Sequence, residues 1–219
     1  MKNVLVIGTC RIHRPLFNFK STKYCFLDDK FGTLAESNQI IQYINLLNNK
    51  SSIPKCIFPY ISCYNRSNYS EEYIEDCKML FNKADIILIE LSSIKECFTF
   101  FELEKYYLDY FKTEMNPPEF MYIKNTELIS ENNICRNIKI IQKLCGNKKV
   151  MFVSHFNVNN IPQRELIIKC IEKTATYYYN PSEFVLKNLP DCITDINHYS
   201  KKYEPLIAKE LINVLDSIN

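Results

Sequence analysis

Residues 4–11, with the sequence VLVIGTCR, decide the fold that the chain predicts. Val4 to Ile7 form an apolar run without polar alternation, which is typical of a parallel strand covered on both faces. The run ends at Gly8, one of only three glycines in 219 residues, which indicates a close approach or a positive φ at this point. Cys10 follows at the carboxyl end of the strand, where open α/β sheets bind their ligands. The alternative is that Cys10 is one of ten mostly buried thiols.

Strands that alternate with helices along the rest of the chain predict a parallel α/β sheet. Further strands are expected at 23–27, 86–91, 149–154 and 177–179. Helices are expected at 35–47, 70–82, 126–145, 162–174 and 201–215, with a short one opened by Pro15 and with Gly146 as a C-cap. The aromatic residues of 97–112 are expected in the core or in a lid over a cleft. With no repeat or linker, residues 1–219 are expected to form a single domain.

The composition restricts the classes of partner. A formal net charge of +2 argues against nucleic acid, which needs a strong basic bias. No apolar run approaches the ~20 residues that cross a bilayer, and the opening MKNVLVIG is too short for a signal peptide. We therefore expect a cytoplasmic protein that binds neither nucleic acid nor membrane, while its oligomeric state stays open.

The ten cysteines predict neither a disulfide framework nor a metal site. Disulfide frameworks belong to short secreted chains, and this chain is neither short nor apparently secreted. No C-x-x-C pair occurs, and Cys56 with Cys63 has no matching second pair, so no metal is expected.

A second motif lies near the end of the chain, where Asp195 and His198 form a D-x-x-H. At this spacing the carboxylate can accept a hydrogen bond from one imidazole nitrogen while the other nitrogen faces a substrate. Alone the motif is weak. Together with Cys10 it supplies a nucleophile, a base and a group that orients the base.

Gly8-Thr9-Cys10-Arg11 and Asp195-Ile196-Asn197-His198 together resemble the first and last sequence blocks of the SGNH/GDSL hydrolase superfamily. The resemblance implies a three-layer flavodoxin-like fold with about five parallel strands over nearly the whole chain. It also implies an oxyanion hole made by Cys10, Gly32 and Ser92, where Ser92 stands at the place of the family's G-x-N-D.

Two residues depart from the superfamily pattern, because Cys10 replaces the usual serine and the oxyanion asparagine is absent. Losing one oxyanion donor typically costs ~3 kcal/mol of transition-state stabilisation. The cysteine is similar to that of an SGNH-like branch from polysaccharide and capsule biosynthesis, which is associated with coenzyme A and acetyl transfer. This resemblance implies acetyl-CoA as cosubstrate and a sugar or sugar nucleotide as the small-molecule partner.

Three side chains near these motifs are candidates for substrate or cofactor binding. Arg11 is either a clamp for phosphate or carboxylate or a solvated surface charge. His13 is expected in a loop near the cleft. His155 follows the strand at 149–154, where it is either a substrate contact or a satisfied core histidine.

Two further charged residues bear on the site. Glu90 lies in a buried strand, so it either needs a basic partner such as Arg11 or Arg14 or lies near the site. Arg164, just after Pro162, is expected to be a solvated helix residue.

The sequence leaves several functions open. The first is an acyltransferase that moves an acetyl group from acetyl-CoA to a sugar through a Cys10–His198–Asp195 triad, either by way of an acyl-cysteine or by direct transfer. For this function we expect a helix N-terminus or the His198 imidazolium to lower the pKa of the Cys10 thiol from about 8.5.

The second function is an SGNH-type esterase or deacetylase that uses water as acceptor. The third is a binding module with an incidental triad. A papain-like protease is disfavoured by the parallel α/β pattern.

Overall fold

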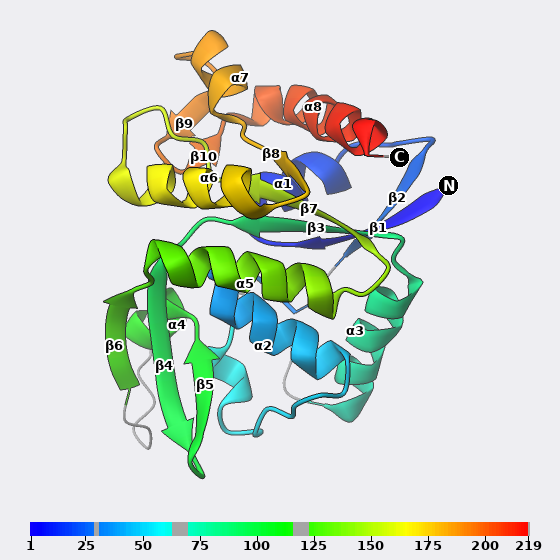
Figure 1. The fold of residues 1–219 in the computed structure, drawn as a ribbon. Coiled ribbons are helices and arrows are strands. Elements are labelled where there is room, and N and C mark those ends of the chain that lie inside the picture. The colour runs from blue at the N-terminus through cyan, green and yellow to red at the C-terminus, as the bar shows by residue number, and fades with distance from the viewer. Residues whose placement is uncertain (29–30, 63–69, 116–122, 219) are drawn as a thin grey trace.

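A computed structural model of the chain describes residues 1–28, 31–62, 70–115 and 123–218. Its centre is a five-stranded parallel sheet in the order β2-β1-β3-β7-β8, with helices on both faces (Figure 1). The strands are β1 (Lys2–Ile7), β2 (Tyr24–Asp28), β3 (Ile86–Leu91), β7 (Lys149–Ser154) and β8 (Tyr177–Tyr179). This order is that of the flavodoxin-like three-layer fold, so the predicted fold class is confirmed.

Strand β1 explains why the opening run carries no polar residue. Val4 and Val6 pack in the cluster on one face of the sheet, while Leu5 and Ile7 pack in the cluster on the other. All four side chains are at most 1% exposed. A strand with helices on both faces must be apolar at every position, as the sequence predicted.

The helices divide between the two faces of the sheet. Buried side chains of α2, α3, α5 and α6 belong to one cluster, whereas those of α1 and α8 belong to the other. The helices are α1 (Cys10–Phe17), α2 (Ser37–Leu47), α3 (Glu71–Lys83), α4 (Tyr110–Met115), α5 (Glu131–Leu144), α6 (Pro162–Thr174), α7 (Ser182–Lys187) and α8 (Glu204–Ser217). Short 3₁₀ turns occur at η1 (Phe58–Tyr60) and η2 (Lys201–Tyr203).

The first helix begins five residues before the Pro15 that the sequence marked as its opening. Thr9 is its N-cap, because the Thr9 hydroxyl accepts a hydrogen bond from the amide of Arg11 at 3.4 Å. Cys10 is therefore the first residue of α1, and Pro15 lies inside the helix. His13 was expected in a loop, but it also lies in α1.

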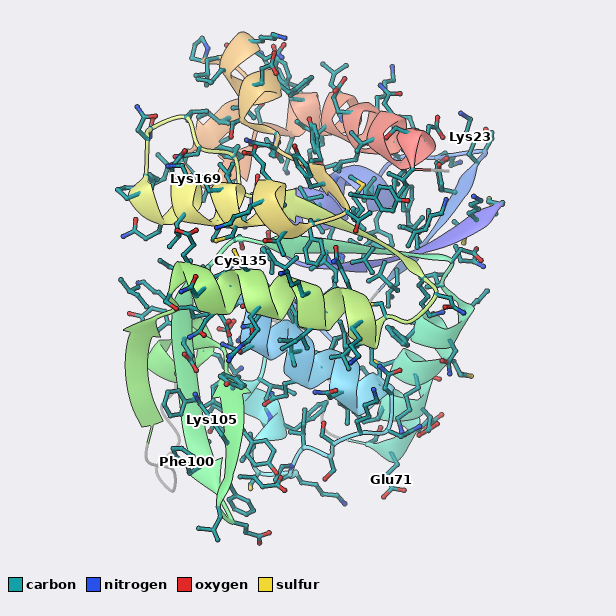
Figure 2. All side chains as sticks on the ribbon, viewed as in Figure 1. Lys23, Glu71, Phe100, Lys105, Cys135 and Lys169 are labelled. Carbon is teal, nitrogen blue, oxygen red and sulfur yellow. The ribbon has the colours of Figure 1, made fainter. Side chains whose placement is uncertain are left out.

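An antiparallel sheet in the order β5-β4-β6 is inserted between β3 and α5. Its strands are β4 (Lys95–Phe101), β5 (Glu104–Leu108) and β6 (Ile123–Leu128). The side-chain amide of Gln42 joins β5 to α2, since it bonds both the amide and the carbonyl of Tyr107 at 2.8 and 3.0 Å. Figure 2 labels Phe100 on β4 and Lys105 on β5 of this sheet.

The inserted sheet corrects two sequence predictions. The stretch at 97–112 forms β4, β5 and the start of α4, which the sequence did not predict. Its Phe98 and Tyr106 are buried, as the core alternative predicted, while Phe100 is 60% exposed. The helix predicted from 126 starts only at Glu131, because Ser130 is the residue whose hydroxyl caps it.

Two expected absences can be checked against the described part of the chain. No helix there is long and apolar enough to cross a membrane. No disulfide joins the described cysteines, which lie at positions 10, 25, 56, 77, 97, 135, 145, 170 and 192.

Gly8 is required by close packing. A Cβ added at Gly8 would lie 2.7 Å from Glu90 Cβ and 2.8 Å from Ile12 Cδ1. We expect Gly8→Ala to lower the free energy of unfolding by about 1–3 kcal/mol, because β3 or α1 must move. Urea denaturation measures this change. Gly146→Asn is the control, because nothing lies within 4 Å of its added Cβ and only the backbone strain at its φ of +63° remains, so its loss should be smaller. Equal stability of the two variants would contradict the packing role of Gly8.

Candidate functional site

The carboxyl ends of parallel strands share one edge of the sheet, and the predicted site residues follow those ends. Cys10 begins α1 just after β1, while Glu90 is the last but one residue of β3. Ser92 follows β3, His155 follows β7, and Gly32 lies between β2 and α2.

Glu90 is a buried carboxylate that joins β3 to the start of α1. It is 1% exposed and accepts hydrogen bonds from the Thr9 amide at 2.9 Å and the Thr9 hydroxyl at 2.5 Å. The Arg11 Nε donates to its other oxygen at 2.5 Å. The predicted pairing of Glu90 with a basic residue is therefore confirmed. Since the Arg11 side chain is only 10% exposed, the interpretation of Arg11 as a solvated surface charge is wrong.

The D-x-x-H forms the turn of a small hairpin between β9 (Ile193–Asp195) and β10 (His198–Tyr199). His198 Nδ1 lies 3.0 and 2.9 Å from the two carboxylate oxygens of Asp195. The hydrogen bond from His198, followed by one from the Asn197 amide, holds the pKa of Asp195 below its ordinary value. An ionised Asp195 keeps the proton of the imidazole on Nδ1, which leaves Nε2 as the basic nitrogen.

Arg11 connects this hairpin to the helix that begins at Cys10. Its Nη1 donates to the Asn197 carbonyl at 3.3 Å, while its Nε bonds Glu90. One guanidinium, on the residue next to Cys10, thus contacts both β3 and the D-x-x-H turn. That Cys10, His198 and Asp195 act together as a triad stays a prediction, as does a contact of Arg11 with substrate.

The Cys10 thiol lies in a different electrostatic environment from the one expected. It is half-buried, and burial raises its pKa above the ordinary value, with a smaller contribution of the same sign from Glu90. Arg11, Arg14 and the Cys10 amide act in the opposite direction but do not outweigh burial. The expectation of a lowered thiol pKa is therefore wrong, and Cys10 is protonated at neutral pH in the resting protein.

The three residues predicted to form an oxyanion hole differ in what they can donate. Cys10 presents its amide at the N-terminus of α1, where helix amides lack intrahelical partners. Gly32 has a φ of 101°, a conformation that favours glycine. The Ser92 amide already donates to the Ala35 carbonyl at 3.0 Å, as does the Ser93 amide, so Ser92 has only its hydroxyl to offer.

The two other histidines, His13 and His155, have different surroundings. His13 stacks on Phe17 with the ring centroids 5.5 Å apart. His155 is 4% exposed, and its Nδ1 lies 2.8 Å from the Phe156 carbonyl. Burial, then the charges of Arg11 and Arg164, lower the pKa of His155 to about 2. His155 is neutral at physiological pH, and its role as a substrate contact stays a prediction.

Arg164 was expected to be solvated, and this expectation is wrong. The residue is 8% exposed and donates to the Ile196 carbonyl and to Asn197 Oδ1, each at 2.7 Å. The burial of Arg164 could have been predicted from the sequence. Arg164 lies at helical spacing from Ile167 and Ile171, which are buried, and so shares their face of the helix.

Glu36 is a second buried acid that the sequence analysis missed. It caps α2 by accepting hydrogen bonds from the amides of Asn38 at 2.6 Å and Gln39 at 3.2 Å. It is 2% exposed, and burial raises its pKa to about 7.

No group of three or more His, Cys, Asp or Glu residues arranged to hold a metal ion occurs within the described ranges. A cavity of about 510 Å³ lies between α2 and α3, with Leu46, Phe58 and Ile74 in its walls. None of the site residues lines this cavity.

The fold and the site define a flavodoxin-like α/β protein that carries a histidine–aspartate pair next to the helix following its first strand. A family model described as the TviD N-terminal domain matches residues 2–122, more than half of the chain. The chain therefore belongs to this family. The matched part includes Cys10, Gly32 and Ser92 and ends before the D-x-x-H. A search of curated proteins found no match.

Removing the charge of Glu90 should destabilise the protein, because Arg11 would then be buried without a counter-charge. We expect Glu90→Gln to lower the free energy of unfolding by about 3–5 kcal/mol, because the guanidinium loses its counter-charge. In a double-mutant cycle with Arg11→Met, the loss in the double variant should be smaller than the sum of the single losses, as urea denaturation will measure. The exposed pair Lys187–Glu183 is the control, and Glu183→Gln should leave stability unchanged. Additive losses at Glu90 and Arg11 would contradict the coupling.

Glu36 predicts a specific pH dependence of stability. Because its pKa is about 7 in the folded protein and about 4.5 in the unfolded chain, the folded state binds the proton more tightly. Its stabilising contribution is complete below pH ~4.5 and is lost as the pH rises through about 7. Subtracting the stability curve of Glu36→Gln from that of the wild type should give a difference that falls by up to about 3 kcal/mol across this window. A flat difference would contradict the raised pKa.

Proposed function

We propose that the protein is an acyltransferase that moves an acetyl group from acetyl-CoA to a sugar or sugar nucleotide in glycan biosynthesis. The TviD family suggests a role in capsule polysaccharide biosynthesis, which supports a glycan as acceptor. The resemblance to SGNH-like proteins with a cysteine at this position supports acetyl transfer. The observation that carries the proposal is the Asp195–His198 pair, which Arg11 holds beside the helix that starts at Cys10.

In the first half of the reaction, Cys10 Sγ attacks the thioester carbonyl of acetyl-CoA while His198 Nε2 takes the thiol proton. Asp195 stabilises the imidazolium that forms. The amide of Cys10, together with Gly32 and the Ser92 hydroxyl, would hold the oxyanion. Collapse of the intermediate breaks the bond to the coenzyme A sulfur, which leaves with the proton from His198, and acetyl-Cys10 remains.

In the second half, a sugar hydroxyl or amine gives its proton to His198 and attacks the thioester of acetyl-Cys10. The bond between the acetyl carbon and Sγ breaks, and the Cys10 thiolate takes the proton back from His198. The enzyme returns to its starting state, with the acetyl group on the sugar.

The raised pKa of Cys10 supports one kind of cysteine chemistry for the proposed reaction. A thiol that is protonated at rest must lose its proton during the attack, as a serine nucleophile does. Cysteine enzymes with a preformed thiolate–imidazolium pair work differently. We therefore expect serine at position 10 to support part of the reaction.

Hydrolysis is the second candidate, and the exposure of the pair favours it. The side chains of His198 and Asp195 are 45% and 52% exposed, so water can reach the base. An esterase or deacetylase would use the same residues with water in place of the sugar hydroxyl.

Incubation with acetyl-CoA, followed by intact mass and peptide mapping, tests the proposal. We expect an acetyl group on Cys10 in the wild type, none in Cys10→Ala, and its transfer to added sugar nucleotides. His198→Ala should slow acetylation by about 10²–10⁴-fold, the usual contribution of general acid–base catalysis. Cys10→Ser should retain measurable transfer.

Cys25→Ala, in β2 and half-buried like Cys10, is the matched control and should be acetylated as fast as the wild type. Cleavage of p-nitrophenyl acetate or acetylated sugars without transfer from acetyl-CoA would favour the esterase. Unchanged ligand binding and no acyl chemistry in wild type, Cys10→Ala and His198→Ala alike would leave only a binding module.

A further inference from the structure

Arg164 is a buried cation that donates two of its three hydrogen bonds to the D-x-x-H turn. It lies in the first turn of α6 and is 8% exposed. Its Nη1 donates to the Phe156 carbonyl at 3.0 Å and to the Ile196 carbonyl at 2.7 Å. Its Nη2 donates to Asn197 Oδ1 at 2.7 Å. These three acceptors are neutral, and two of them belong to the D-x-x-H turn.

Asn197 is held from three directions. Arg164 binds its side-chain oxygen, Arg11 binds its carbonyl at 3.3 Å, and its amide donates to Asp195 Oδ1 at 2.6 Å. The two arginines come from α6 and α1, which pack on opposite faces of the sheet. Their planar guanidinium groups fix direction as well as distance, which an ammonium group does not.

The hairpin is not held by backbone pairing with the central sheet. Its strands have three and two residues and pair only with each other among the described strands. A two-stranded hairpin is marginally stable in water. Ile193 and Tyr199 pack against the cluster that contains α1 and α8, and the Tyr199 ring centroid lies 5.1 Å from that of Phe156. These contacts hold the strands of the hairpin, whereas the two arginines hold its turn.

We infer that Arg164 is a positioning residue, which acts through Ile196 and Asn197 to fix the His198 imidazole relative to Cys10. The inference rests on the proposed function for its kinetic consequence but not for its structural one. Arg164 touches no reacting atom in this scheme. Its loss should leave acetyl-CoA binding intact and disturb the base, because a misplacement of about 1 Å can cost about 10²-fold in rate.

Hydrogen exchange combined with kinetics tests the inference on Arg164→Gln and Arg164→Lys. We expect amide exchange in residues 193–199 to accelerate at least tenfold in Arg164→Gln, with protection of β1, β3 and β7 unchanged. The kcat of acetyl transfer should fall ten- to a hundredfold while KM for acetyl-CoA stays within twofold. Arg164→Lys keeps the positive charge but loses the planar pair of N–H donors. Its exchange rate and its kcat should lie between those of the wild type and Arg164→Gln.

Lys169→Gln is the matched control on the same helix. Lys169, labelled on α6 in Figure 2, has a side chain that is 67% exposed, and its removal should change neither readout. Asn197→Ala is a second variant, for the case that Arg164→Gln does not fold. It removes the side-chain oxygen that accepts from Arg164 Nη2, and because Asn197 is exposed the core stays intact. It should accelerate exchange in the same segment.

The outcomes separate the inference from the proposed function. Unchanged exchange at 193–199 in the variants that fold would overturn the positioning role, whatever the activity. A fall in activity through KM alone, with kcat preserved, would also overturn it. Faster exchange in a protein whose wild type transfers no acetyl group would uphold the positioning role and remove the proposed function.

Discussion

The structure depends on the burial of one carboxylate, that of Glu90, beneath the start of α1. An isolated buried charge is costly, and three donors from Thr9 and Arg11 offset this cost. Gly8 makes the approach possible, because any side chain there would collide with Glu90. The same contact orients Arg11 toward Asn197, so the core also contributes to the placement of the D-x-x-H turn.

The two halves of the proposed site are therefore held by different means. Cys10 lies on a helix that is packed on the sheet and fixed through Glu90. His198 lies on a short hairpin outside the sheet, where side chains of Arg11 and Arg164 substitute for backbone pairing. In the proposed reaction His198 would serve two successive proton transfers, so both means of placement would have to keep it in register with Cys10.

Much of the fold could be predicted from local pattern. The bounds of β3, β7, β8 and α6 were correct because unbroken apolar runs and a proline at a first helical turn are local signals. The inserted sheet was missed because its strands depend on pairing with one another, and Thr126 with Glu127 imitated a helix start. The contact between Asp195 and His198 follows from spacing. The raised pKa of Cys10 and the burial of Arg164 do not, since both depend on how much of the molecule surrounds the group.

Cross-linking with 1,3-dibromoacetone tests most directly whether the two ends of the chain meet. This reagent alkylates a thiol and then joins it to a nucleophile within the reach of its three-carbon bridge. If Cys10 and His198 share one site, peptide mapping will find the peptide of Cys10 joined to that of His198, and the link will be absent in His198→Ala. Modification of Cys10 without any link to His198 in the folded wild type would contradict the site described above.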